Sequence, residues 1–562
     1  MGKPIKNITI VGGGTAGWMT AALLNARLSH GRGPDAPKIT VVESPDIPTV
    51  GVGEATVPNM PRTLQEIGID QETFFKECNA SFKLGVLFGG WNVDNDGNKI
   101  DYINPFGGGK FLNGFGTGEY FRKYGGGGLS YTATICPAAA LYELGKGPGQ
   151  ASQEGLHPAV GYAYHLDAGL FAKLLQRHAT ERGVTHILDN VVSVEQDARG
   201  NISQLNLQEH DPHPVELVVD CTGFRGLIIN EMLDQPFIDY SKYLANDRAM
   251  AVQIPHPHEH HIDSVTKATA LGAGWSWRVP LYNRIGTGYV FSSAHRTDEE
   301  ARDEFCAFLG DQRPKDAEPR VIPMRIGRNE RAWVGNCIAM GLSGGFIEPL
   351  ESTAIHMIDQ AIRWLTGNFP DQDFPDPVVN RFNKLMAKLY DEVRDFICLH
   401  YALGNRTDDQ YWIDARKLDV PDSLAENLEL WKYRLPLPED LEFASLFPAT
   451  TYEVVLLGKR VYETGFGKDK FIENPALSPE PWRQYLQEFV GQMEKFAPAM
   501  SDHRDLLNKL RGEVSQVGMP EFSMGPGPTI GMAPSGNKMS AKLDLGDLSN
   551  RMKSTEEEAG LL

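Results

Sequence analysis

The chain has 562 residues, of which 41% are hydrophobic and 23% charged, and its formal net charge is −19. This composition suits a soluble protein that can bury a core, and no run of 18 apolar residues predicts a membrane-spanning helix. The acidic balance disfavours binding to nucleic acid or to an anionic membrane.

The N-terminus and the cysteines predict where the protein resides. An apolar strand begins within a few residues of Met1, so we expect no signal peptide. The six cysteines are scattered and include no CxxC pair, which predicts reduced thiols and no metal site. We therefore expect a cytoplasmic protein.

The first segment predicts a dinucleotide-binding βαβ unit. A strand is expected at 8–11, a helix at about 16–28 and a second strand at 39–42 that ends at Glu43. The first turn reads Gly12-x-Gly14-x-x-Gly17, in which the glycines allow a tight turn, a close approach of the pyrophosphate and close packing of helix on strand. Glu43 can accept hydrogen bonds from ribose hydroxyls. This pattern does not choose between FAD and NAD, and the chain shows no second such turn.

Further along, the predicted elements change from strands to helices. A strand is expected at 82–88, and the glycine-rich stretch 106–128 predicts mobile loops, either a surface insertion or a lid or tunnel wall. More strands follow at 184–221, 274–293 and 331–340, the last leading through a glycine-rich turn into a helix. From about Pro375 the apolar spacing is helical, with a second helical run at 480–511.

The predicted fold is a mixed α/β (α+β) fold. It combines an FAD-binding, Rossmann-like βαβ core with a β-sheet substrate region and a helical C-terminal subdomain. We expect three parts: a 1–370 FAD-binding module that includes the 106–128 loops, a 371–512 helical subdomain covering the substrate, and a 513–562 tail that is largely disordered.

Several segments resemble the flavin-dependent tryptophan-halogenase family. The resemblance runs to about residue 405 and is most specific in VGEATVP (52–58), CNASFKLGVLFGGW (78–91), GWSWRVPLYNRIGTGYVFSS (274–293) and GFIEPLESTAI (345–355), with DCTGFRG (220–226) and RDFICLHY (394–401) in support. It implies FADH2-dependent halogenation of an electron-rich aromatic molecule, through a flavin hydroperoxide and hypohalous acid. We expect FAD to contact, besides Gly12, Gly14, Gly17 and Glu43, also Thr15, Ala16, Glu54, Val191, Leu342 and Ile355.

Two residues in these segments are the candidate catalytic groups. If 81–88 is one strand, Lys83 shares a face with Ser81 and Gly85, which leaves space around its amine. An isolated lysine is usually a solvated surface residue, but the resemblance implies that Lys83 is the essential lysine that activates hypohalous acid. It likewise implies that Glu351 orients this acid or accepts the proton lost from the ring; without it, Glu351 would simply complement a helix dipole.

A halide site and an aromatic wall complete the expected site. Ser352 or Thr353 can cap the following helix, and the amides of Thr353 and Ala354 at its start could hold chloride or bromide. The family usually has glycine at the position of Ala354, which puts the geometry of this halide site in question. Trp275 and Trp277 fall two residues apart on one strand face, either as core aromatics or, as the resemblance implies, as a wall between flavin and substrate.

The flavin must be reduced from outside the chain, so we expect an NAD(P)H-dependent flavin reductase as functional partner. We expect an indole- or phenol-like substrate, because residues 446–462 do not match the family's contacts to free tryptophan; within them, Tyr452 and Glu453 could contact substrate or simply pack. An FAD-dependent aromatic hydroxylase is the nearest alternative, and a non-catalytic flavoprotein is a second.

Overall fold

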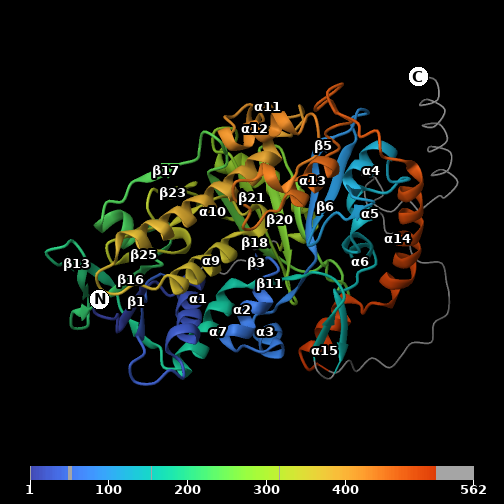
Figure 1. Cartoon of the computed structure of the whole chain (residues 1–562). Coiled ribbons are helices and arrows are strands. Elements are labelled where there is room, and N and C mark those ends of the chain that lie inside the picture. Colours follow the sequence, from blue (N-terminus) through green and yellow to red (C-terminus); the bar gives the residue numbers. More distant parts are fainter. Residues whose placement is uncertain (1, 48–52, 153–154, 315–316, 514–562) are drawn as a thin grey trace. The chain divides into compact units, whose positions relative to one another are not determined.

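The computed structural model describes residues 2–47, 53–152, 155–314 and 317–513 (Figure 1). These residues form two compact units, each assembled from three stretches of chain: unit 1 from the described parts of 1–80, 163–254 and 283–397, and unit 2 from those of 81–162, 255–282 and 398–513. These units differ from the segments 1–370 and 371–512, which remain a prediction. The predicted tail lies, from residue 514 on, outside the described residues.

Unit 1 is built on a six-stranded sheet with the order β12-β2-β1-β16-β25-β24. Its strands are β1 (Asn7–Val11), β2 (Lys38–Glu43), β12 (Thr185–Leu188), β16 (Leu217–Asp220), β24 (Trp333–Val334) and β25 (Cys337–Ala339). The pairs along β12-β2-β1-β16-β25 are parallel, and β24 runs antiparallel to β25. The predicted βαβ opening is confirmed, because α1 (Thr15–Leu24) connects β1 to β2, with a π-helical turn at Asn25–Ser29.

Helices and smaller sheets complete unit 1. Its other helices are α2 (Met60–Ile67), α3 (Gln71–Glu77), α7 (Ala168–Glu181), α8 (Asp298–Leu309), α9 (Ala354–Gly367) and α10 (Asp376–Ala402), whose last residues fall in unit 2. Its other strands are β3 (Gly53–Ala55), β11 (Ala163–Asp167), β13 (Val191–Gln196), β14 (Ile202–Leu207), β15 (His213–Pro214), β17 (Phe237–Asp239), β18 (Arg248–Ile254), β21 (Ile285–Phe291), β22 (Arg320–Pro323), β23 (Gly327–Asn329) and β26 (Gly345–Phe346). Helix α1, apolar on nearly all sides and buried from Gly17 to Leu24, packs against α7 and α9.

Unit 2 is built around the strands β20-β19-β5-β6. These are β5 (Gly85–Val93), β6 (Lys99–Pro105), β19 (Thr266–Ala270) and β20 (Gly274–Pro280), and unit 2 also holds β4 (Ser81–Lys83), β7 (Phe111–Leu112), β8 (Phe115–Gly116), β9 (Gly149–Ser152) and β10 (Gly155–Pro158). Its helices are α4 (Thr117–Tyr124), α5 (Tyr131–Ile135), α6 (Ala138–Glu143), α11 (Gln410–Ala415), α12 (Asp422–Leu430), α13 (Ala449–Gly458), α14 (Pro479–Ala499) and α15 (His503–Leu510). Leu84, Tyr131, Val265 and Val454 meet in its core.

Two local predictions need correction. The stretch 106–128 is more than a loop, because β7, β8 and α4 form within it; Tyr120 of α4 is buried against Trp482. The expected strand 82–88 is two strands, β4 and β5, that are interrupted at Leu84, whose amide donates to the carbonyl of Ser264 instead. The predicted helices after residue 375 and at 480–511 are confirmed. No helix among the described residues is long and apolar enough to span a membrane.

Candidate active site

The turn after β1 forms a cradle for a dinucleotide. Gly12 has φ +115° and donates its amide to Val42 O at 2.8 Å. A Cβ at Gly12 would lie 2.3 Å from the carbonyl oxygen of Cys221, and one at Gly17 would lie 1.8 Å from that of Gly12. A Cβ at Gly14 would meet nothing within 4 Å, so open space lies over the backbone where α1 begins. This is the space that a pyrophosphate needs at a helix N-terminus, and the turn therefore fits FAD.

Two acidic residues expected at this cofactor lie in different settings. Glu43, at the end of β2, accepts a hydrogen bond from Trp18 Nε1 at 3.3 Å, and its Oε2 lies 3.0 Å from His186 Nε2. Glu54, in β3, is only partly exposed, and burial raises its pKa to about 7. A raised pKa favours the neutral carboxyl group, which can donate as well as accept a hydrogen bond. Both contacts to FAD remain predictions.

The other expected FAD contacts also lie in unit 1. Thr15 begins α1, with Ala16 beside it, and Thr15 Oγ1 donates to Ala168 O at 3.3 Å. Val191 begins β13, Leu342 is 37% exposed, and Ile355 is buried in the first turn of α9. A Cβ at Gly341, beside Leu342, would lie 2.8 Å from Ala16 Cβ, so the Leu342 turn lies close to the start of α1. These five contacts remain predictions.

Lys83 ends β4 and is fully buried, with 0% of its surface exposed. Its Nζ lies 5.4 Å from the centre of the Phe106 ring. The expectation that Gly85 leaves space around the Lys83 amine is wrong. A Cβ at Gly85 would lie 2.4 Å from the backbone oxygen of Asn104. Gly85 instead allows β6 to approach β5. The amine is therefore held among protein groups, away from bulk water.

Contacts of the residues before and after Lys83 fix its position, and after it the amide of Leu84 donates to Ser264 O at 2.7 Å. Ser81 Oγ donates to Pro280 O, and the amide of Phe82 donates to His503 Nε2 at 3.1 Å. The other ring nitrogen, Nδ1, lies 3.0 Å from Ile262 O, which can only accept, so Nδ1 carries the proton. Burial lowers the pKa of His503 to about 4, which keeps the imidazole neutral and Nε2 able to accept. No sequence pattern points to His503, because it lies 421 residues from Phe82.

Trp275 and Trp277 form a continuous aromatic surface on β20. Their ring centres lie 6.4 Å apart at an interplanar angle of 61°, as expected for residues on one strand face. Trp275 is 2% exposed and packs against Trp91 at 6.2 Å, while Trp277 is half-buried. Trp91 in turn donates from Nε1 to Ala268 O at 3.0 Å. The predicted pairing is present, with Trp91 as a third tryptophan against Trp275, and the role as a wall between flavin and substrate remains a prediction.

Glu351 lies in a strained turn just before α9. Its φ is +67° and that of Ser352 is +61°, two successive left-handed residues that are not glycine. Such conformations cost about 1–3 kcal/mol each and are retained mainly at functional sites. Glu351 is buried, with 7% exposed. Thr353 is the N-cap of α9, as predicted, although its side chain makes no capping hydrogen bond.

The amides of Thr353 and Ala354 have no acceptor within α9, because the first N–H groups of a helix lack an intrahelical partner. Outside the helices and strands of the described chain, no backbone carbonyl accepts from them. These groups and the positive end of the helix dipole could hold a small anion. The geometry fits the expected halide site, which remains a prediction.

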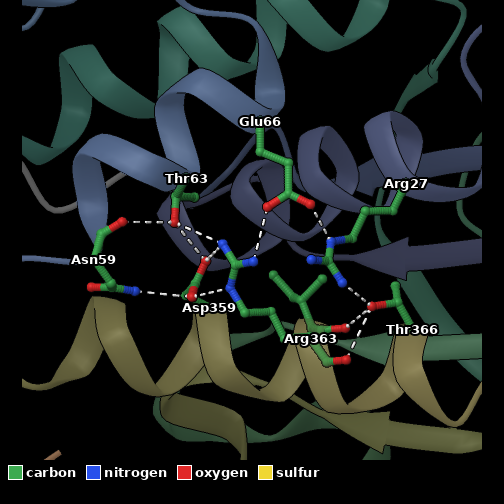
Figure 2. A network of polar contacts seen from close by, with 8 residues as sticks. Arg27, Asn59, Thr63, Glu66, Asp359, Arg363 and Thr366 are labelled. Atoms are coloured by element: carbon green, nitrogen blue, oxygen red, sulfur yellow. Dashed lines mark hydrogen bonds and ion pairs between the residues drawn. The ribbon is translucent and has the colours of Figure 1, made fainter.

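A polar network ties α9 to α2 and to the π-helical turn that follows α1 (Figure 2). Asp359 is 1% exposed and accepts from Thr63 Oγ1 at 2.8 Å, Asn59 Nδ2 at 2.9 Å and Arg363 Nε at 2.6 Å. Arg363 also donates to Glu66 at 2.9 Å, which accepts from Arg27 at 2.6 Å. The network thereby fixes the helix that carries the candidate halide amides.

The open question about Tyr452 and Glu453 has a partial answer. Both residues are buried in α13; Tyr452 packs against Trp431 with ring centres 5.3 Å apart. Glu453 accepts a hydrogen bond from Tyr131, and burial raises its pKa to about 7. A Cβ at Gly118 would lie 2.5 Å from the Glu453 carboxyl carbon, so the glycine-rich stretch lies directly on this carboxyl group.

A sequence profile described as tryptophan halogenase matches residues 7–468, which is more than half of the chain. The chain belongs to the tryptophan halogenase family. Among curated relatives, the tryptophan 6-halogenase SttH of Streptomyces toxytricini is 38% identical over 474 residues, covering 80% of this chain and 88% of the relative.

Solved structures of this family have the same fold. A tryptophan halogenase from Shewanella frigidimarina NCIMB 400 superimposes with a TM-score of 0.84 at 34% identity, covering 91% of this chain and 98% of that one. BrvH, a flavin-dependent halogenase from Brevundimonas sp. BAL3, has a TM-score of 0.78 at 36% identity and covers 90% and 99%. The predictions of a mixed α/β fold and of a flavin-dependent halogenase are confirmed, and the comparisons give no support to the hydroxylase alternative.

Proposed function

We propose that this enzyme halogenates an electron-rich aromatic small molecule of the indole or phenol class, with Lys83 presenting the halogen to the ring. The observation that carries the proposal is the fully buried Lys83 at the end of β4, held by backbone contacts on both sides in a chain of the halogenase family. A positioned amine can hydrogen-bond hypohalous acid or attack its halogen.

The cofactor is FAD in its reduced form, held by the Gly12–Gly17 turn and by the contacts expected from Glu43 and Glu54. Reduced flavin supplies the two electrons with which oxygen is activated toward chloride or bromide. A separate NAD(P)H-dependent flavin reductase restores the reduced cofactor. The halide binds at the Thr353 and Ala354 amides, where the helix dipole of α9 favours a negative charge.

The remaining steps belong to side chains of the protein. Lys83 holds hypohalous acid, the aromatic ring attacks the halogen, and the oxygen leaves as hydroxide. The substituted ring carbon then loses its proton, and Glu351 is the acceptor. Trp275 and Trp277 keep the substrate away from the flavin, so that halide rather than substrate is oxidised there. The relative SttH is named for tryptophan. For this chain we propose a substrate other than free tryptophan, because residues 446–462 do not match securely the contacts that the family makes to it.

The test is a substrate panel of indoles, phenols and free tryptophan, with flavin reductase and with chloride and bromide in parallel, followed by mass spectrometry. Lys83→Ala should abolish halogenated product while FAD binding persists. Lys267→Ala is the matched control, since Lys267 is a half-buried lysine of the same unit that pairs with Asp263 at 2.7 Å. Product from the Lys83 variant at the wild-type rate, or hydroxylated product unaffected by halide, would refute the proposal.

A further inference from the structure

His356 lies in the first turn of α9 and has a buried imidazole ring. It is 7% exposed, and neither ring nitrogen has a hydrogen-bond partner among the described residues. Burial lowers its pKa to about 4, with Asp359 opposing the shift and Arg363 adding to it, so the ring is neutral at physiological pH. A neutral imidazole has one N–H donor and one acceptor, and leaving both unused in the interior is unfavourable.

The position of His356 in the helix limits where its side chain can reach. Thr353 is the N-cap of α9, which makes His356 the third helical residue. In many helices this residue is Glu or Gln, whose side chain folds back to take up the N-cap amide. Side chains of a helix also lean toward its N-terminus. A side chain at this position can therefore reach toward the Thr353 amide.

The identity of this residue decides what the helix start can bind. A glutamate at this position would occupy the Thr353 amide and repel an anion. A neutral histidine leaves the Thr353 and Ala354 amides available and adds an N–H of its own. The polar network on the same helix, at Asp359 and Arg363, holds the body of α9 against α2 (Figure 2). No described residue of this network hydrogen-bonds the His356 ring.

We propose that His356 is a third donor to the halide ion, with its ring N–H adding to the amides of Thr353 and Ala354. The inference rests on the proposed function, in which chloride or bromide binds at the start of α9. It goes further by assigning a side chain to a site that backbone groups alone would otherwise form. That donor compensates for Ala354, whose methyl group stands where the family usually has glycine.

The test measures bromide binding to the enzyme loaded with oxidised FAD, through the absorbance change of the flavin, with gluconate holding the ionic strength constant. His356→Phe keeps a flat ring but removes both nitrogens, and should weaken bromide binding about tenfold or more, as expected for one hydrogen bond to a charged group. His356→Gln restores an N–H donor and should bind within about threefold of wild type. His178→Phe is the control, a buried histidine whose Nε2 already bonds Ile67 O at 2.9 Å.

A second measurement on wild-type enzyme keeps the test decisive if the phenylalanine variant fails to hold FAD. With ¹⁵N-labelled histidine, bromide should shift the ring resonance of His356, assigned by its absence in His356→Gln, with the same dissociation constant that the flavin reports. Bromide binding with an unmoved His356 resonance, or with equal affinity in His356→Phe, overturns the role of His356. Failure of wild type to bind bromide at all instead overturns the halide site of the proposed function.

Discussion

Replacing His503 with leucine tests whether a residue distant in sequence positions Lys83. The imidazole accepts from the Phe82 amide and donates to Ile262 O. Leucine is of similar size but makes neither bond, so two buried backbone groups lose their partners. At about 1–3 kcal/mol each, the variant should lose about 2–6 kcal/mol of unfolding free energy. That is a large share of the typical 5–15 kcal/mol, so the loss should be plain in urea denaturation.

The kinetic consequence separates positioning from simple stability. If β4 shifts by about 1 Å, kcat should fall on the order of 100-fold, while KM for the aromatic substrate changes little. His503→Gln, whose amide can both accept and donate, should recover most of kcat. His178→Leu is the matched control: it removes a single hydrogen bond of another buried histidine, in unit 1, and should leave kcat unchanged in folded enzyme. A folded His503→Leu enzyme with wild-type kcat would refute the reasoning.

Three further changes have expected outcomes. Asp359→Asn breaks a buried ion pair with Arg363 and should cost about 3 kcal/mol in urea denaturation; an unchanged midpoint contradicts this. Gly14→Ala should leave the thermal midpoint of the FAD-free chain unchanged but weaken FAD binding at least about tenfold in a fluorescence titration, because the added methyl group fills the open space at the start of α1. The control Gly491→Ala, also in open space, should not change FAD binding. Glu453 has a pKa raised from 4.5 to about 7, so its contribution to the free energy of unfolding is complete below pH 4.5 and is lost as pH rises through 7. In unfolding experiments between pH 5 and 8, Glu453→Gln should therefore remove up to about 3 kcal/mol of the fall in stability with pH. An equal fall in both proteins would count against this role of Glu453.

The sequence predicted those parts of the fold that depend on local patterns. The Gly12–Gly17 turn, its two strands and its helix depend on residues within about forty positions of one another, and the structure agrees with them. The two tryptophans of β20 were likewise predictable, because alternation along a strand fixes which side chains share a face. Family resemblance singled out Lys83 and Glu351 as the candidate catalytic residues, which no local pattern distinguishes from ordinary surface charges.

What could not be predicted depends on contacts between distant segments. Gly85 looked like a source of space, but β6 takes that space, and only pairing across the sheet shows it. His503 supports the strand of Lys83 from 421 residues away, and a single sequence without relatives offers no sign of such a contact. Helix α4 formed within glycine-rich chain because the ring of Trp482 covers Tyr120, a tertiary contact that overrides weak helix propensity.

The strain before α9 and the polar network along it are best understood together. Two left-handed residues, Glu351 and Ser352, cost about 1–3 kcal/mol each. Hydrogen bonds to charged groups contribute about 1.5–3 kcal/mol each, so the charged contacts of Asp359 and Arg363 suffice to offset that strain. The network acts on the helix body, and none of its described members hydrogen-bonds the His356 ring in the first turn. A helix held firmly along its length can therefore keep the strained Glu351 turn and the candidate halide amides at its start.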